Sequence, residues 1–375
     1  MKIAVYNPYN FEFPGGVLDH VTAQSHELRR RGHDVTILTP RPRKYSGETP
    51  PDMIFTGVSA RIKAQSSQVD ISSVMDSIET DTLWHEHQFD VVHFHEPTVP
   101  FAARQLIASC PYPVVATLHA ALPDTAIGKT LGSIKPYFRG ILQHVDILTR
   151  VSVAAGQYLE EEIDHADAVF IPNGLELKKF RKGSAENRMD ATIFYVGRLE
   201  KRKGPRYLLQ AFAILKKRIP HATLVLASDG PDRQKLEDFV REYHLHDVTF
   251  LGFVDEDVKR DYLKRATVAC YPALYGESFG VVLLEAMASG VPIVAGNNPG
   301  YETVLTGRGA LGLVNPTDTV ALANRLQLFL EDAGLRQMLS AWGLQHVKQF
   351  DYTHIVDSYE AVYKRAIEKH RKAVR

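Results

Sequence analysis

Two glutamates in one short segment have the spacing to bind the two ends of a polar ligand. Glu277 and Glu285 stand eight positions apart, in a run that begins at Gly276 and enters a predicted helix near Gly280. The first amides of a helix lack internal partners and carry partial positive charge, so they suit an anion such as a diphosphate. Glu285 lies about 9 Å along the helix axis from its start, and both carboxylates can accept hydrogen bonds from hydroxyl groups near that anion. An ordinary amphipathic helix preceded by an acid would have the same pattern.

Cations that balance a diphosphate occur in a second run, which begins at Arg198 and opens another predicted helix. Arg198 offers a planar fork to phosphate oxygens, and Lys203 offers a mobile point charge. Two such cations balance about two phosphate charges, so this run can stabilise a departing diphosphate without a metal ion. We interpret Lys201 and Arg202 as a solvated basic turn. Gly16, after the first predicted strand, lets backbone amides face a phosphate, although a simple turn fits equally.

These candidate residues all follow predicted β-strands. Short β-branched runs alternate with helical patterns along nearly the whole chain, and the alternation restarts once, near residue 190. Near-continuous apolar strands between helices are typical of parallel sheets that are covered on both faces. The predicted strands span 2–8, 35–40, 91–96, 114–119, 147–152 and 168–172 in the first series, and 192–197, 223–228, 248–254, 268–272, 292–295 and 311–314 in the second.

The sequence therefore predicts an α/β fold with two doubly wound, Rossmann-like domains facing across a cleft. The 375 residues also exceed the size at which single cores stop growing. We place the first domain at 1–173 and the second at 174–351, and we expect a C-terminal helix at about 352–375 to pack back on the first. Ligands bind at the carboxyl ends of the strands in such sheets, which is where the charged runs lie.

Composition limits the partners and the location. The 44 basic and 44 acidic residues give a formal net charge of zero, which argues against nucleic acid as the main partner. Cys110 and Cys270 allow no disulfide framework and no zinc-binding CxxC pair. Apolar runs are too short for a signal peptide or a membrane span, so we expect a cytoplasmic protein. Seven basic residues at 364–375 would allow peripheral contact with the inner membrane face, although a solvated helix end explains them better.

Four segments occur together in the order found in one enzyme family. They are Pro14-Gly15-Gly16-Val17, His93-Phe94-His95-Glu96-Pro97, Gly197-Arg198 with Lys203-Gly204, and the run from Glu277 to Glu285. Together they resemble retaining glycosyltransferase family 4, whose members have the GT-B fold of two Rossmann-like domains. Within that family, the chain looks most similar to the phosphatidylinositol mannosyltransferases. The resemblance covers nearly the whole chain, and the pair of glutamates is its most specific part.

The resemblance implies retaining, metal-independent transfer of a hexose, with mannose favoured, to a hydroxyl acceptor that is lipid-linked in the similar enzymes. The donor would be GDP-mannose or another GDP- or UDP-sugar, a substrate and not a cofactor. The implied catalytic residues are His119, Glu277, Arg198 and Lys203. The implied donor-binding residues are Gly16, Arg198, Lys203, Gly230, Val254, Glu256, Lys259, Glu277, Ser278, Phe279, Gly280, Val281, Val282 and Glu285, with Glu277 on the sugar and Glu285 on the ribose. The implied acceptor-binding residues are Tyr9, Thr98 and Arg61.

Departures from the subfamily concentrate in the acceptor half. Leu18, Ala120 and Asp124 stand where the similar enzymes carry polar or basic acceptor contacts. The stretch at 72–87 contains acids and neither lysine nor arginine, where the subfamily has a basic, membrane-seeking helix. The identity of the acceptor therefore stays open.

Two patterns suggest a metal site. His93, His95 and Glu96 alternate on a predicted strand, but no further ligand set is evident in the sequence. Asp255 and Asp257 form a DxD pattern, which binds a metal in a different glycosyltransferase fold. Because the pattern lies here between a strand and a helix, we interpret it as a helix N-cap and predict no metal.

Other classes of function stay open. A nucleotide-sugar epimerase of the same architecture and a non-catalytic nucleotide-sugar-binding protein both fit the donor half. A phosphorylase would need a pyridoxal-binding lysine and a much longer chain, and neither is evident. A dehydrogenase would need a G-x-G-x-x-G run after the first strand, which this sequence lacks.

Overall fold

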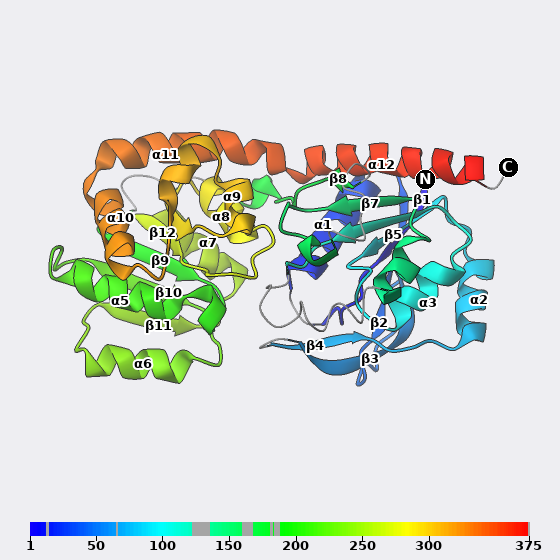
Figure 1. Ribbon diagram of the computed structural model, residues 1–375, viewed down its shortest axis with the longest axis horizontal. Helices are drawn as coiled ribbons and strands as arrows, with labels where there is room; N and C mark the ends of the chain where they lie inside the picture. The colour runs from blue at the N-terminus through cyan, green and yellow to red at the C-terminus, as the bar shows by residue number, and fades with distance from the viewer. Residues whose placement is uncertain are drawn as a thin grey trace. The chain divides into compact units, whose positions relative to one another are not determined.

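The computed structural model describes residues 1–12, 15–64, 67–121, 136–159, 168–180, 183 and 188–373. It divides into two compact units (Figure 1). Unit 1 comprises Met1–Gly174 and Tyr352–Arg375, and unit 2 comprises Leu175–Asp351. Sequence analysis placed this boundary between residues 173 and 174. Pro14 and Asp124, which were named above, lie outside the described residues.

Unit 1 is built on an eight-stranded sheet with the strand order β4-β3-β2-β1-β5-β6-β7-β8. Neighbouring strands are parallel, apart from β3 and β4, which form an antiparallel pair. The strands are β1 (Lys2–Tyr6), β2 (Asp34–Arg41), β3 (Met53–Ala64), β4 (Ser67–Ser72), β5 (Val91–His95), β6 (Val114–Leu118), β7 (Ile147–Arg150) and β8 (Val169–Phe170). The helices include α1 (Gly16–Arg30), α2 (Ser77–Glu86), α3 (Ala102–Ser109) and α12 (Tyr352–Ala373).

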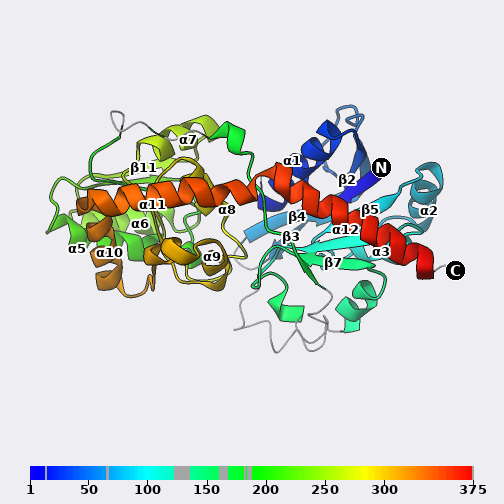
Figure 2. The same cartoon turned by 90° about the horizontal axis from the view of Figure 1, so that it is seen from above.

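Helices cover both faces of this sheet because side chains alternate along each strand. Ile3 and Val5 of β1 pack in one apolar cluster with α1 and α12. Ala4 and Tyr6 pack in another with α2 and α3. The C-terminal helix α12 runs across the strands beside α1 (Figures 1 and 2). The helix α12 thus contributes to the core of unit 1.

The pair of strands β3 and β4 was not predicted. Their sequences mix serine, threonine and charged residues, so they lack the continuous apolar run that marks the buried parallel strands. Arg61 of β3 forms an ion pair with Asp70 of β4, with 2.8 Å between Nε and Oδ1. This cross-strand pair lies at the edge of the sheet, where one side of a strand is unpaired.

Unit 2 contains a six-stranded, wholly parallel sheet with the order β11-β10-β9-β12-β13-β14. The strands are β9 (Thr192–Val196), β10 (Thr223–Ala227), β11 (Val248–Gly252), β12 (Val268–Tyr271), β13 (Ile293–Gly296) and β14 (Leu313–Val314). The helices include α5 (Pro205–Lys216), α6 (Arg233–Glu242), α7 (Glu256–Arg265), α8 (Val281–Ala288), α9 (Pro299–Val304), α10 (Thr319–Glu331) and α11 (Ala333–His346).

Alternation along β9 again separates two faces. Ile193 and Tyr195 belong to the apolar cluster that includes residues of α5, α6 and α10. Phe194 points to the other face, where its ring stacks on Tyr262 of α7 at 5.5 Å. Both units therefore have helices on either side of a largely parallel sheet, and the predicted fold class is confirmed.

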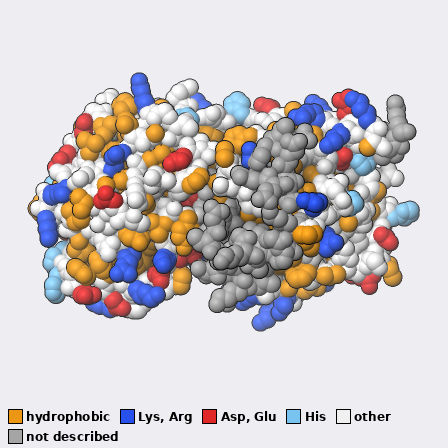
Figure 3. All heavy atoms as spheres, in the orientation of Figure 1, with side chains coloured by type: hydrophobic (Ala, Val, Ile, Leu, Met, Phe, Trp, Pro, Cys, Tyr) orange, Lys and Arg blue, Asp and Glu red, His pale blue; other side chains and the backbone are white. Residues whose placement is uncertain are grey.

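The distribution of charge on the surface and the hydropathy of the helices are relevant to the expected partners. On the face of unit 2 that Figure 3 shows, basic and acidic side chains are interspersed. This pattern accords with the zero net charge. Within the described part of the chain, none of the helices is both long and apolar enough to cross a membrane.

The core of unit 1 contains four histidines, which come from α1, from β5 and from the end of β6. They are His20, His93, His95 and His119. His93 contacts the hydroxyl groups of Thr117 and Tyr363, at 2.6 and 2.8 Å. Burial lowers the pKa of His93 and of His119 to about 3, and it lowers the pKa of His20 and His95 well below the usual 6.5. All four rings are therefore neutral at neutral pH.

Acidification should destabilise unit 1. Between pH 6.5 and about 3, these histidines are protonated in the unfolded chain but neutral in the folded protein. The free energy of unfolding should thus fall as the pH falls, by up to about 1.4 kcal/mol per pH unit for each histidine. Burial raises the pKa of Glu96, so this residue has the opposite effect. Thermal melts followed by the fluorescence of Trp84, in a Trp342→Phe background, should give a lower Tm at pH 5.5 than at pH 7.5.

The matched control removes an exposed histidine. His93→Gln should reduce the pH dependence by about one proton, whereas His221→Gln, at a side chain that is 67% exposed, should leave it unchanged. Equal Tm values at the two pH values in the parent protein would contradict the assignment of neutral buried rings.

Candidate functional site

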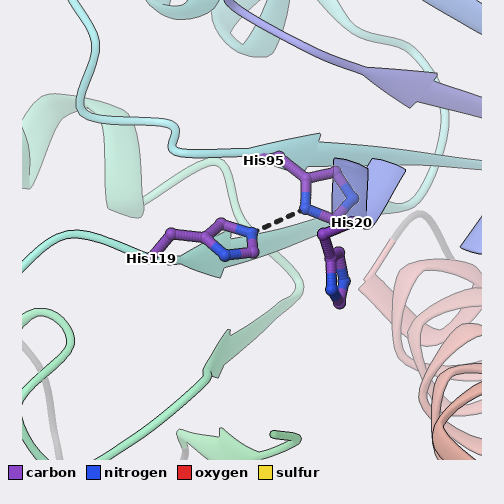
Figure 4. A group of neighbouring side chains, drawn as sticks. All are labelled: His20, His95 and His119. Atoms are coloured by element: carbon purple, nitrogen blue, oxygen red, sulfur yellow. Dashed lines mark hydrogen bonds between the residues drawn. The ribbon is translucent and has the colours of Figure 1, made fainter. Parts of the chain in front are cut away.

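The carboxyl ends of β5 and β6 bring the histidine and glutamate candidates of unit 1 together. The two strands are parallel neighbours, with His95 opposite Thr117, so the residues that follow them leave the sheet side by side. Nδ1 of His95 lies 2.8 Å from Nε2 of His119, and the two rings share a hydrogen bond (Figure 4). The predicted catalytic residue His119 is thus held by a second histidine.

Glu96 fixes the backbone that carries His119. Its Oε2 accepts hydrogen bonds from the backbone N–H groups of His119 and Ala120, at 3.0 and 2.8 Å. Its Oε1 accepts one from the hydroxyl group of Thr98, at 3.1 Å. The residue is buried and has a φ of 50°, in the left-handed region that L residues seldom adopt. The sequence pattern suggested a metal-ligand role for Glu96, and its contacts show a different use.

Of the three predicted acceptor residues, Tyr9 and Thr98 are close to Glu96, whereas Arg61 is bonded elsewhere. Thr98 also contacts the hydroxyl group of Tyr158, at 2.9 Å. Burial, and then the charge of Glu96, raise the pKa of Tyr9. Tyr9 and Thr98 are therefore both associated with Glu96. Arg61 is on the β3–β4 pair, bonded to Asp70.

Three of the buried histidines lie close enough together to be compared with a metal site. Among the described residues, ring nitrogens of His20, His95 and His119 lie within 4.8 Å of one another. Tetrahedral zinc binds nitrogen at 2.0–2.1 Å, which would bring the ligand atoms to about 3.4 Å from one another. The nitrogens of His20 face tyrosine hydroxyls, and His95 bonds His119, so the arrangement is that of a hydrogen-bonded cluster.

In unit 2, the basic run forms a single 3-10 turn, Lys201–Lys203, between β9 and α5. Gly204 ends the turn with a φ of 71°, and a Cβ there would lie 2.0 Å from the carbonyl oxygen of Pro272. Only glycine fits this backbone and this approach. The turn is therefore held against the end of β12, from which the loop to Glu277 departs.

The Glu277 carboxylate contacts two of the basic side chains of this turn. Its Oε1 is 2.6 Å from Nζ of Lys203 and 2.9 Å from Nη1 of Arg202. Arg202 also pairs with Glu200, whose side chain is 2% exposed, with 2.6 Å between Nε and Oε1. Arg198 is more exposed, and its Nε lies 3.7 Å from Glu200. The cluster contains three cations and two carboxylates.

The interpretation of Arg202 as part of a solvated turn was wrong. The side chain bridges two carboxylates, because the turn folds back over the loop that carries Glu277. Glu200 was missed as well. An acid between basic residues suggests a surface ion pair, and nothing in the local sequence indicates its burial.

Glu285 forms a second ion pair with a residue of a neighbouring helix. Nζ of Lys259 on α7 lies 2.8 Å from both Glu285 and Glu256. Burial lowers the pKa of Lys259, but the two carboxylates outweigh burial and raise it overall. Asp255 caps α7, since its side chain accepts a hydrogen bond from the Val258 amide at 2.8 Å. The N-cap interpretation of the DxD pattern is therefore confirmed.

Around the start of α8, some residues are partly exposed and others are packed in the core. Gly280, with a φ of 98°, precedes the helix, and a Cβ there would meet the ring of Tyr301 at 2.6 Å. Phe279 is 1% exposed, and its ring packs on Phe350. Any contribution of Phe279 to donor binding therefore comes from its backbone. The partly exposed residues around the helix start include Ser278, Gly280, Val281 and Val282.

The other donor candidates lie at the ends of elements. Gly230 follows β10, and a Cβ there would lie 2.4 Å from the Leu199 carbonyl oxygen, so it packs against the basic loop. Val254 lies partly exposed between β11 and α7. Gly16 is the first residue of α1 in unit 1.

Comparison with known proteins shows the family of the chain. Residues 14–179 match the family model described as "Glycosyltransferase Family 4". Residues 177–345 match the model "Glycosyl transferases group 1". A phosphatidyl-myo-inositol mannosyltransferase of Mycolicibacterium smegmatis is 32% identical, over 97% of this chain and 93% of its own. A glycogen synthase of Mycobacterium tuberculosis is 27% identical, over 94% of this chain and 93% of its own.

Solved structures share the fold. A sucrose-phosphate synthase from Thermosynechococcus elongatus superposes with a TM-score of 0.77 at 24% identity, covering 97% of this chain and 98% of its own. A glycosyltransferase from Rickettsia africae gives 0.76 at 16% identity, covering 98% of each chain. The family models and the mannosyltransferase relative together show that the chain belongs to the group 1 glycosyltransferases of family 4 and is a hexosyltransferase.

Proposed function

We propose that this enzyme transfers mannose from GDP-mannose to a hydroxyl acceptor, with retention of the anomeric configuration and without a metal ion. The observation that carries the proposal is the cluster of Glu277 with Lys203 and Arg202 at the strand ends of unit 2. The 32% identical relative named as a mannosyltransferase supports the choice of sugar. Membership of the family disfavours the alternatives of an epimerase and a binding protein.

The donor half of the chemistry lies in unit 2. The Glu277 carboxylate accepts hydrogen bonds from sugar hydroxyls, and Lys203 and Arg202 hold it in place. The Glu285 carboxylate, held by Lys259, accepts from the ribose. Val254 and Glu256 lie beside the base. In this proposal the two ion pairs keep carboxylates pre-oriented before the donor arrives.

The diphosphate leaves with the help of fixed positive charge. Arg198 and Lys203 face its oxygens, and the first amides of α8 add the partial charge of a helix start. As the bond from the sugar carbon to the phosphate oxygen breaks, the acceptor oxygen bonds to that carbon from the same face. The acceptor proton passes to the departing phosphate oxygen, so no separate base is required. Lys203 is shared between Glu277 and the diphosphate.

The acceptor half is proposed for unit 1. His119, neutral and hydrogen-bonded to His95, positions the reacting sugar through its ring or its backbone carbonyl. Tyr9 and Thr98 contact the acceptor near Glu96. The relatives suggest a chemical class for the acceptor but do not identify the acceptor itself. A lipid-linked hydroxyl with peripheral contact at a membrane is proposed from the name of the mannosyltransferase relative.

Removal of the Lys203 ammonium should lower kcat by about 100-fold, as loss of one charge that stabilises a developing anion does in other enzymes. The Lys203→Met variant is compared with Lys201→Met, because Lys201 lies in the same turn but is exposed. Release of GDP is the measurement. Equal kcat values for the two variants would remove Lys203 from the leaving-group role.

Loss of the Glu277 charge should weaken sugar binding in the transition state. Glu277→Gln should reduce kcat/KM for GDP-mannose by about 10- to 100-fold, the range for a hydrogen bond to a charged group. Glu237→Gln is the matched control, since that glutamate pairs with Arg233 of its own helix, α6, instead of with a cation of the basic turn. Wild-type turnover by Glu277→Gln would exclude Glu277 from the site.

A screen of donors and acceptors should identify the reaction. GDP- and UDP-sugars are offered with phosphatidylinositol vesicles and with soluble polyols, with and without EDTA. We expect GDP release to be fastest from GDP-mannose and unchanged by EDTA, and NMR of the product to show the same anomeric configuration as the donor. Loss of activity in EDTA would refute metal independence, and an inverted product would refute retention.

A further inference from the structure

His20 is a buried residue for which the mechanism has so far no role. It lies on α1 and is 2% exposed. Its ring centroid is 5.1 Å from that of His119 and 5.3 Å from that of His95, edge-to-face in both cases. Figure 4 shows the three rings together, with the hydrogen bond between His95 and His119 beside the His20 ring. His20 therefore supports both members of that bonded pair.

Two tyrosine hydroxyls of α12 hold the His20 ring. The Tyr352 hydroxyl lies 3.3 Å from Nδ1, and the Tyr359 hydroxyl lies 3.3 Å from Nε2. A neutral imidazole has one N–H and one lone pair, so one hydroxyl accepts a hydrogen bond and the other donates one. Rotation of the ring would break a bond at each nitrogen, and a buried polar atom without a partner is unfavourable.

Besides its side-chain hydrogen bond with Asn173, His119 has three contacts that constrain different parts of the residue. Glu96 binds its backbone N–H, which places the loop but leaves the side chain free to rotate. The hydrogen bond to His95 fixes one ring nitrogen. The His20 ring packs edge-to-face against both rings of the pair.

We propose that His20 is a positioning residue for the transfer reaction: held by Tyr352 and Tyr359, it keeps the bonded pair of His95 and His119 in one orientation. This inference rests on the role proposed above for His119. It also makes the C-terminal helix, which is remote in sequence, a determinant of the catalytic geometry of unit 1.

The tyrosine hydroxyls allow a test that keeps His20 and the apolar packing of α12. The double variant Tyr352→Phe with Tyr359→Phe removes both hydroxyls from His20. Tyr363→Phe is the matched control, because its buried hydroxyl, on the same helix, contacts Gln24 and His93 instead. The double variant should lower kcat by about tenfold at a nearly unchanged KM for the donor, since small displacements of reacting groups are costly. Tyr363→Phe should stay within about twofold of the parent.

A spectroscopic readout separates positioning from stability. Long-range proton–nitrogen NMR correlations of ¹⁵N-labelled histidine report the tautomer and hydrogen bonding of each ring. The signals of His95 and His119 should shift in the double variant and stay in place in Tyr363→Phe. His20→Gln, which keeps a donor and an acceptor, should retain more kcat than His20→Leu.

Two results would overturn the inference. One is a kcat for the double variant no lower than that for Tyr363→Phe, and the other is unchanged signals of His95 and His119. Failure of the proposed function looks different. Wild-type turnover by His119→Ala would remove the catalytic role of His119 itself, whereas loss of activity in His119→Ala with an active double variant would overturn only the role of His20.

Discussion

A carboxylate that is taken out of water must be met by cations or by N–H and O–H groups, and four of the buried glutamates near the strand ends and at α8 illustrate that constraint. Each is less than a tenth exposed. Glu200 and Glu277 share the cations of one turn, and Glu285 pairs with Lys259. Glu96 instead accepts backbone amides and hydroxyls. The glutamates at the strand ends thereby fix the loops, and the loops carry the residues that the proposed reaction uses.

The two units meet this constraint in different ways. In unit 2 the partners are long, flexible cations, which in the proposed reaction are shared with an arriving diphosphate. In unit 1 the partners of Glu96 are mainly the backbone and neutral hydroxyls, and the rings beyond it are neutral histidines. One unit is thus suited to exchange partners with an anion, whereas the other is suited to hold a fixed shape.

The sequence predicted the elements whose pattern is local. Apolar β-branched runs identified most parallel strands. The charged runs after these strands led to the roles proposed for Arg198, Lys203 and Glu277. The β3–β4 pair escaped because its residues mix polar and charged types and lack the continuous apolar run of the buried strands. Arg202 was misjudged and Glu200 was missed because their partners are set by the folding of a turn onto a distant loop. His20 was missed for the same reason, since one histidine on a helix face does not indicate which rings it will meet.

The place of α12 in unit 1 has a consequence for biosynthesis. This helix of 22 residues contributes buried side chains such as Ile355, Tyr359 and Val362 to the core of unit 1, although it is synthesised after the whole of unit 2. While the ribosome extends the chain, unit 2 can complete its core from contiguous residues. In unit 1, the apolar surface that α12 covers stays exposed until α12 has been synthesised. The first residues to be translated are therefore among the last to be fully buried, and exposure to chaperones and proteases falls mainly on unit 1.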